Sequence, residues 1–244
     1  MIDLSADLAE GARDEAKIWL MITSANVACG GHIGDTRSMA TAVRRAKRHG
    51  VRLGAHPSYP DREHFGRIDI LDSPGVRPAD LPGIVTDQLV LFQKVCDACG
   101  AKFHHVKFHG ALYNRAARDP AVSAILCETI RQFDPSLIIY GLRGSVMKEQ
   151  AERCGLRFAG EIFADRSYLE DGSLRPRTEP GALIEDPVLA VRQVLGMISG
   201  AADTVRADTV CIHGDGPHAF SFAQTIHAAL LQQGIAIRPP HTIA

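Results

Sequence analysis

The chain has 244 residues, of which 45% are hydrophobic and 23% charged, and its formal net charge is −1. This length allows one large domain, and the mixed charges form neither a basic patch for nucleic acid nor a polybasic amphipathic segment for a membrane surface. The longest apolar runs have the length of strands, well below the roughly 20 residues of a membrane-spanning helix. The N-terminus is acidic where a signal peptide would be basic, so we expect a cytoplasmic protein with reduced cysteines.

The first half of the chain alternates short apolar runs with helical patterns. Strands are predicted at 2–8, 22–29 and 51–56, and helices at 15–21 and 35–50. The second helix has an N-cap residue in Asp35 and a stop signal in Gly50. A polar loop at 57–79 precedes a long helix from about 82 to 99.

The second half continues the alternation. Its predicted strands are 103–109, 137–142, 157–164 and 209–215. One predicted helix follows Asp119, a second ends at Gly155, a third begins at Asp186 and a fourth ends at Gly234. A loop at 165–185 and a short IAI segment complete this half. Repeated β-then-α units imply parallel strands with helical crossovers. About seven units predict an α/β fold, a single (β/α) barrel domain over residues 1–244. No dinucleotide-binding G-x-G-x-x-G follows the first strand, and no P-loop occurs.

The stretch FHHVKFHG places His105, Lys107 and His109 on one face of a strand, where a half-buried strand needs apolar residues. We explain this by a site at the strand's end, because the carboxyl ends of parallel barrel strands meet on one catalytic rim. Other strands also end in polar residues: Asp7 and Glu10, Asn26, His32 and Asp35, His56, Glu161, Asp165 and Arg166, and His213 and Asp215. Each has a structural explanation alone, as Asp35 does as a helix cap, but together they predict an active site.

Two chemistries fit this set, and the residues alone leave both open. Asp7, His56 and His109 could hold a divalent metal with open positions for water and substrate. Alternatively Asp7 is a general base, and Lys107, His109 and His213 are acids and oxyanion stabilisers without a metal. We place Asp215 with the catalytic group, and we expect substrate contacts from four further residues: Asn26, His32, Glu161 and Arg166.

Nucleophilic catalysis is a weaker interpretation. Ser24 and Ser58 lie near strand ends, but neither stands in a G-x-S-x-G turn. Cys29, in the sequence ACGGH, could be activated by a neighbouring histidine, although a small buried residue closing a strand fits it better.

Taken in order, the motifs resemble the LamB/YcsF family. They are DLAEG (7–11), ITSANVACGGHIGD (22–35), GAHPSYPDREHFGR (54–67), VKFHGALYN (106–114), EIFADRSYLEDGSLRPR (161–177), GALIEDP (181–187) and IHGDGP (212–217). The family's N-C-D-L-G-E reads SADLAE here (5–10), its C-G-F-H-A-G-D reads CGGHIGD (29–35), and its K-P-H-G reads KFHG (107–110). The chemical residues within these motifs are retained: Asp7, Glu10, His32, Asp35, Lys107 and His109.

The resemblance implies a barrel akin to carbohydrate deacetylases, whose metal pattern would map onto Asp7, His56 and His109. It also implies an ATP-dependent 5-oxoprolinase that opens 5-oxoproline to glutamate together with two partner subunits, of B and C type. Because the chain has no P-loop, we expect ATP to be used with the partners, which activate the lactam, while this chain performs or completes the hydrolysis. The sequence leaves the metal and any homo-oligomer open.

Two other functions remain open at this point. One is a stand-alone metal-dependent deacetylase or amidohydrolase, and the other is a scaffold without catalysis, for which Asp7→Ala and His109→Ala would leave complex activity intact. The loops 57–79 and 165–185 are long for a compact barrel and could be lids or partner contacts. Their arginines could contact a carboxylate or phosphate: Arg62, Arg67, Arg166, Arg175 and Arg177.

Overall fold

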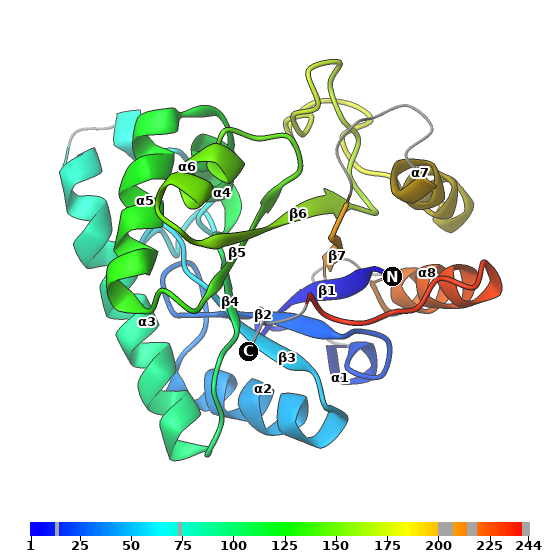
Figure 1. The fold of residues 1–244 in the computed structure, drawn as a ribbon, viewed down its shortest axis with the longest axis horizontal. Helices are drawn as coiled ribbons and strands as arrows, with labels where there is room; N and C mark the ends of the chain where they lie inside the picture. Colours follow the sequence, from blue (N-terminus) through cyan, green and yellow to red (C-terminus); the bar gives the residue numbers. More distant parts are fainter. Residues whose placement is uncertain (13–14, 73–74, 200–206, 214–218, 241–244) are drawn as a thin grey trace.

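Seven parallel strands close into a barrel in the computed structural model, which describes residues 1–12, 15–72, 75–199, 207–213 and 219–240. Their order around the barrel is their order in the chain, and the last pairs with the first (Figure 1). The strands are β1 (Asp3–Leu8), β2 (Ser24–Ala28), β3 (Arg52–His56), β4 (His105–Lys107), β5 (Ile138–Leu142), β6 (Arg157–Phe163) and β7 (Thr209–His213). The predicted α/β barrel with about seven parallel strands is confirmed.

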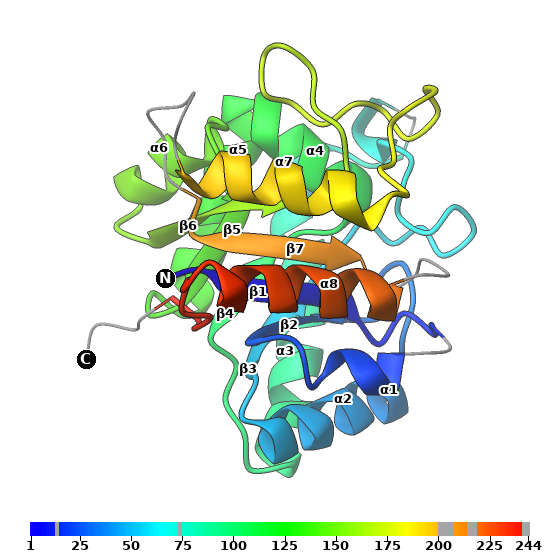
Figure 2. The ribbon, with the colours of Figure 1, turned by 90° about the vertical axis from the view of Figure 1, so that its right-hand side faces the viewer.

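Helices surround the barrel, and Figure 2 shows α7 and α8 on either side of β7. The α-helices are α1 (Glu15–Ile18), α2 (Thr36–His49), α3 (Leu81–Ala98), α4 (Gly110–Arg118), α5 (Pro120–Phe133), α6 (Met147–Arg153), α7 (Pro187–Ser199) and α8 (Ala219–Gln232); two 3₁₀ helices, η1 (Ile70–Asp72) and η2 (Pro78–Asp80), interrupt the loop before α3. None of the helices in the described ranges is long and apolar enough to cross a membrane.

Local sequence explains where most helices begin and end. Asp35 caps α2 by accepting a hydrogen bond from the Ser38 amide, and Gly50 ends the helix with φ of 69°. The helix α4 is missing from our sequence prediction. It starts at Gly110 directly after β4, and its N-cap residue His109 makes no side-chain capping bond, so the usual start signal is absent.

The apolar core lies between the barrel and its helices. On β1 the residues Leu4, Ala6 and Leu8 alternate with the polar Asp3, Ser5 and Asp7, and all six are buried. Because successive strand residues face opposite sides, the apolar set packs on the helices and the polar set fills the barrel. Large core residues on the surrounding helices, such as Met39 and Phe92, complete the apolar layer.

The interior of the barrel is polar, which our sequence prediction did not include. His105 does not reach the rim; its ring stacks on Tyr140 with centroids 4.0 Å apart, and its Nε2 lies 2.8 Å from Asn26 Oδ1. A side chain at Gly54 would overlap the His105 ring, so glycine is required there. Polar residues facing inward on these strands therefore serve the barrel interior as well as the rim.

The loop between β6 and α7 is folded back on itself, as Figure 1 shows above the barrel. Isolated antiparallel bridges join Arg166 to Leu183 and Tyr168 to Leu174. The Ser167 amide donates to the Ala182 carbonyl at 3.0 Å. This folding holds the loop's arginines over the end of the barrel where the site lies.

Candidate active site

A cavity of about 1020 Å³ opens at the carboxyl ends of the strands. Its lining includes the strand-end residues Asp7, Glu10, His56, Lys107 and His109, which sequence analysis had placed on one rim. All five are at least nine-tenths buried. Charged groups buried beside a cavity are the usual setting of an active site.

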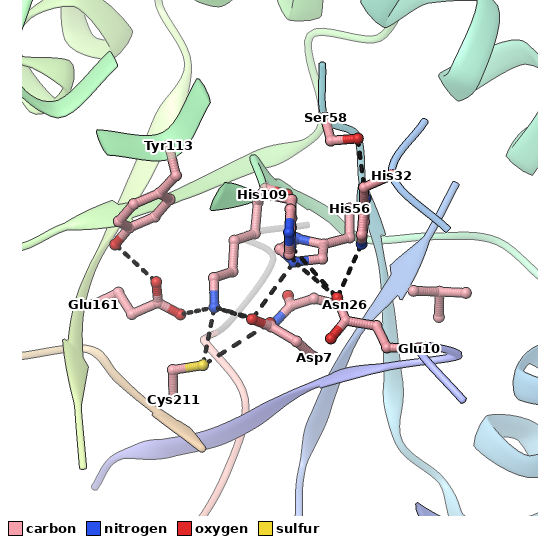
Figure 3. A network of polar contacts seen from close by, with 12 residues as sticks. Asp7, Glu10, Asn26, His32, His56, Ser58, His109, Tyr113, Glu161 and Cys211 are labelled. Atoms are coloured by element: carbon pink, nitrogen blue, oxygen red, sulfur yellow. Dashed lines mark hydrogen bonds and ion pairs between the residues drawn. The ribbon is translucent and has the colours of Figure 1, made fainter. Parts of the chain in front are cut away.

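Lys107 lies within a buried cluster of acids at the centre of the site, where Figure 3 labels its partners Asp7 and Glu161. Its Nζ lies 2.9 Å and 3.1 Å from the Asp7 carboxylate oxygens, 3.0 Å from Glu161 Oε1 and 2.9 Å from Cys211 Sγ. Burial alone would lower the pKa of Lys107, but its acidic neighbours outweigh burial and hold that pKa well above its ordinary value. The lysine is therefore a fixed ammonium.

Glu161 and Asp7 share this single ammonium. The second oxygen of Glu161 accepts a hydrogen bond of 2.8 Å from the Tyr113 hydroxyl, and burial raises the pKa of the Glu161 carboxyl. Asp7 also accepts a bond of 2.9 Å from the Asn26 side-chain amide. Glu10 is a third buried carboxyl of the site. Burial alone would lower the pKa of His56, but the charge of Asp7 outweighs burial and raises that pKa.

The tautomers of two histidines follow from carbonyl groups, which can only accept hydrogen bonds. His56 Nδ1 donates to the Lys107 carbonyl at 2.7 Å, and His109 Nε2 donates to the Phe65 carbonyl at 2.9 Å. In the neutral rings, His56 Nε2 and His109 Nδ1 are then both acceptors, and they face each other at 3.0 Å. Two facing lone pairs at this distance require a proton or a cation between them.

Glu10 completes a set of three atoms with the geometry of metal ligands. Its Oε1 lies 3.4 Å from His109 Nδ1 and 3.8 Å from His56 Nε2. A tetrahedral ion with bonds of about 2.1 Å separates its ligand atoms by about 3.4 Å. The residues Glu10, His56 and His109 therefore fit a divalent cation.

The carboxylate in this set is Glu10, whereas the sequence predicted Asp7 with the same two histidines. Asp7 Oδ2 lies 3.5 Å from His56 Nε2, but among the described residues the carboxylate that forms a close set with both histidines is that of Glu10. Glu10 reaches the histidines because Ala9 before it has a φ of 65°, which turns the chain back immediately after β1. A positive φ is rare for alanine, and sequence alone gives no sign of it.

Ser58 and His32 lie behind Glu10, and the three side chains form a line that resembles a hydrolase triad (Figure 3). His32 Nδ1 lies 2.9 Å from Ser58 Oγ, and its Nε2 lies 3.0 Å from Glu10 Oε1. Ser58 is fully buried and is absent from the cavity lining, so it has no path to a substrate. Burial lowers the pKa of His32 to about 4, which makes the ring a neutral support for Glu10.

The other predicted residues divide between the cavity and the layer behind it. Arg166 lines the cavity, whereas Asn26, His32 and Glu161 lie behind it and contact the lining residues. Their geometry fits positioning roles. The predicted residue Asp215 and the side chain of His213 lie outside what the structure describes. Cys29 is buried, and burial raises the pKa of its thiol to about 12, which agrees with a structural role.

Cys211 and Tyr113 belong to the site but were not predicted from sequence. Cys211 lies in the middle of a β7 run that reads as an ordinary apolar strand, and Tyr113 lies on α4, the helix that the sequence did not reveal. Cys211 contacts Lys107 across the barrel, and Tyr113 donates a hydrogen bond to Glu161, which pairs with Lys107. A single sequence holds no signal for that arrangement.

Comparison with known proteins places the chain among relatives that match it from end to end. The model of the LamB/YcsF family matches residues 2–244. The A-type subunit of the 5-oxoprolinase from Histophilus somni (strain 129Pt) is 43% identical over 244 residues, with 97% of each chain covered. The crystal structure of the lactam utilization protein from Thermus thermophilus has 38% identity and a TM-score of 0.86, with 98% of this chain and 99% of that one covered.

A more distant structure shares the fold alone. The catalytic domain of the peptidoglycan N-acetylglucosamine deacetylase from Eubacterium rectale ATCC 33656 has 12% identity and a TM-score of 0.54, and the match covers 100% of this chain and 89% of that one. The expected kinship with deacetylase barrels is confirmed at the level of the fold. The match over nearly the whole chain and the shared sequence establish that this protein belongs to the LamB/YcsF family.

Proposed function

We propose that this chain is the subunit of a 5-oxoprolinase that hydrolyses the cyclic amide of 5-oxo-L-proline to L-glutamate. The functions for which its relatives are named, lactam utilization and 5-oxoproline hydrolysis, support this assignment. The observation that carries it is the buried cluster of Asp7, Glu10, His56, Lys107 and His109 along one cavity. Hydrolysis of an amide needs a general base and a stabilised oxyanion, and this cluster offers both.

In the proposed reaction, water attacks the lactam carbonyl and Asp7 accepts its proton. Lys107 and Asn26 hold the Asp7 carboxylate in one orientation through the bonds described above. As the ring C–N bond breaks, the proton passes to the leaving nitrogen, so the products are the free amine and the carboxylic acid. The same carboxyl serves as base and then as acid.

Glu10, His56 and His109 would hold a divalent cation beside Asp7. The cation would supply Lewis-acid polarisation of the lactam carbonyl. Its ligands are oriented by the layer behind them, because His32 supports Glu10 and two backbone carbonyls fix the histidine tautomers.

We assign the use of ATP to partner subunits of B and C type. Opening an unstrained lactam in water is unfavourable, which gives a reason for coupling to ATP. The sequence has no P-loop, so we assign activation of the lactam to the partners and hydrolysis to this chain.

The test combines the purified chain with the two partner subunits, ATP and 5-oxo-L-proline, and measures L-glutamate. Glutamate should form only when the chain, both partners and ATP are all present. Turnover of 5-oxoproline by the chain alone, without ATP, would refute the division of labour. Acetate release from N-acetylated substrates by the chain alone, with no glutamate from the full mixture, would instead favour the stand-alone deacetylase.

A further inference from the structure

Arg166 is a buried cation whose hydrogen bonds are incomplete. Its side chain lines the cavity, and the residue is only 4% exposed. One guanidinium nitrogen donates to the Arg175 carbonyl at 2.5 Å, but its Nε has no partner among the residues that the structure describes. A buried donor without an acceptor is costly and commonly marks the place of a ligand.

Two further arginines lie near Arg166 and line the same cavity: Arg177 and Arg67. Burial, together with the positive charges of Arg177 and Arg67, lowers the pKa of Arg166 to about 10, and Asp165 only partly opposes them. The half-buried Arg177 guanidinium makes no hydrogen bond or ion pair within the described ranges. The charges of Arg166 and Arg177 therefore meet beside a cavity, and an anion would relieve the repulsion between them.

The cluster connects directly to the proposed reaction centre through Phe65. The Arg67 guanidinium lies 4.8 Å from the centre of the Phe65 ring, and that ring packs edge-on against His109 with centroids 5.3 Å apart. The Phe65 carbonyl also fixes the His109 tautomer. The arginines and the histidines His56 and His109 line one and the same cavity.

The structure also separates these arginines from the others on the two long loops. Arg62 donates to the Gly30 and Gly34 carbonyls, at 2.9 Å and 3.2 Å, and so fastens a loop. Arg175 forms an ion pair of 3.0 Å with Glu179. Their charges are used within the protein, whereas Arg166 and Arg177 keep donors available.

We propose that Arg166, Arg177 and Arg67 form an anion subsite that binds a carboxylate or phosphate group of the substrate and orients its lactam toward Asp7. Guanidinium groups suit this role because their planar donors match both anions in pairs. The identity of the occupant rests on the proposed function, but anion binding itself does not. A carboxylate would belong to 5-oxoproline, and a phosphate would belong to a lactam activated by the ATP-using partners.

Calorimetric titration of the full-length chain tests the subsite with three probes: 5-oxo-L-proline, inorganic phosphate, and 2-pyrrolidone, which is the same ring without the carboxylate. At least one anion should bind, and 2-pyrrolidone should bind at least about tenfold more weakly, as expected for loss of a charged hydrogen bond. Binding of 5-oxoproline identifies the carboxylate as the occupant, and binding of phosphate alone identifies the activated substrate.

Arg177→Gln should weaken binding of that anion about tenfold or more. Because Arg177 is only half-buried, we expect this variant to fold. Arg153→Gln is the control, because Arg153 is exposed, pairs with Glu149 and is absent from the cavity lining, and the affinity of this variant should equal that of the wild type. Equal affinity of Arg177→Gln and the wild type, or no anion binding by the wild type, would overturn the subsite. Normal anion binding without glutamate formation in the complete mixture would overturn the proposed function and leave the subsite standing.

Discussion

Asp3 and Asp7 lie four residues apart on β1, and both carboxyls face the barrel interior, yet their surroundings differ. Asp3 is fully buried among hydroxyl groups and accepts bonds of 2.6 Å from Thr23, 2.8 Å from Ser24 and 2.8 Å from Thr209. No ion pair is found for it within the described ranges, and burial raises its pKa to about 6. Asp7, which is 3% exposed, is paired with an ammonium and lines the cavity.

A buried polar residue in this barrel is therefore not by itself a sign of an active site. The lower interior around Asp3 satisfies its polar groups with neutral partners. The upper interior has several carboxyls for one ammonium, two histidine lone pairs in contact, and an opening to the cavity. Buried ion pairs beside an opening are what separates the reactive region from the structural one.

The largest expected effect comes from Lys107→Met, which removes the ammonium that pairs with Asp7 and Glu161. Asp7 and Glu161 would then be buried without a counter-charge, so the free energy of unfolding should fall by about 3–5 kcal/mol. Denaturant unfolding measures the change. Lys148→Met is the control, because its pair with Glu152 is about half exposed, and it should change stability by less than about 1 kcal/mol. A similar small change for Lys107→Met would mean that the buried ion pair does not stabilise the site.

Metal loading separates Glu10 from Asp7 as the carboxylate ligand. After incubation with zinc, manganese or cobalt, elemental analysis should find about one ion per wild-type chain. Glu10→Gln and the double variant His56→Ala/His109→Ala should lose it, whereas Asp7→Asn should keep it. The exposed His64, which pairs with Asp61, supplies a control in His64→Ala.

Loss of the ion in Asp7→Asn but not in Glu10→Gln would restore the ligand set predicted from sequence. No ion in the wild type with any of the three metals would favour the metal-free chemistry of Asp7, Lys107 and His109.

The pH dependence of stability should reveal Asp3 as the member of the pair with the raised pKa. Its pKa is raised from 3.8 to about 6 in the folded protein, so the folded state binds its proton more tightly than the unfolded chain does. The contribution of Asp3 to the free energy of unfolding therefore falls by about 2 kcal/mol as pH rises from about 4 to about 6.

Asp3→Asn removes this contribution. The stability of Asp3→Asn relative to the wild type should increase by about that amount over the same pH range. Unfolding curves of both proteins at several pH values give the difference directly. A constant difference from pH 4 to pH 7 would mean that Asp3 is ionised throughout, like an ordinary aspartate.

The smallest effect is expected at Ala9, whose φ of 65° brings Glu10 into the site. Ala9→Gly should raise the free energy of unfolding by up to about 1 kcal/mol, because glycine adopts this conformation without steric cost. Ala40→Gly, within α2, should have the opposite sign and destabilise by about 1 kcal/mol. Destabilisation by Ala9→Gly would show that the turn carries no strain.

The sequence predicts the strands and their ends well because both follow local rules. Two-residue alternation identified Lys107 and His109, and the common rim of parallel strands grouped them with Asp7 and His56. It could not predict contacts made by barrel closure, such as that of Lys107 with Glu161 and Cys211. These depend on the relative height of strands that are far apart in the chain.

Local exceptions explain the other differences. Glu10 became a ligand candidate only through the unusual conformation of Ala9, and α4 starts at a glycine without a capping side chain. Arg177 reaches the cavity because its long loop folds back on itself, and the isolated bridges of that loop have no strand pattern in the sequence. In each case the backbone departs from what its residues favour locally.

The deciding measurement is glutamate formation by Asp7→Asn and Asp3→Asn, each combined with both partner subunits, ATP and 5-oxo-L-proline. Both substitutions remove one buried carboxylate from the same face of the same strand. Asp7→Asn should lose activity about 100-fold or more, as expected for a general base, and Asp3→Asn should stay within about tenfold of the wild type. Wild-type activity in Asp7→Asn, or an equal loss in both variants, would contradict the division of the barrel into a reactive upper and a structural lower region.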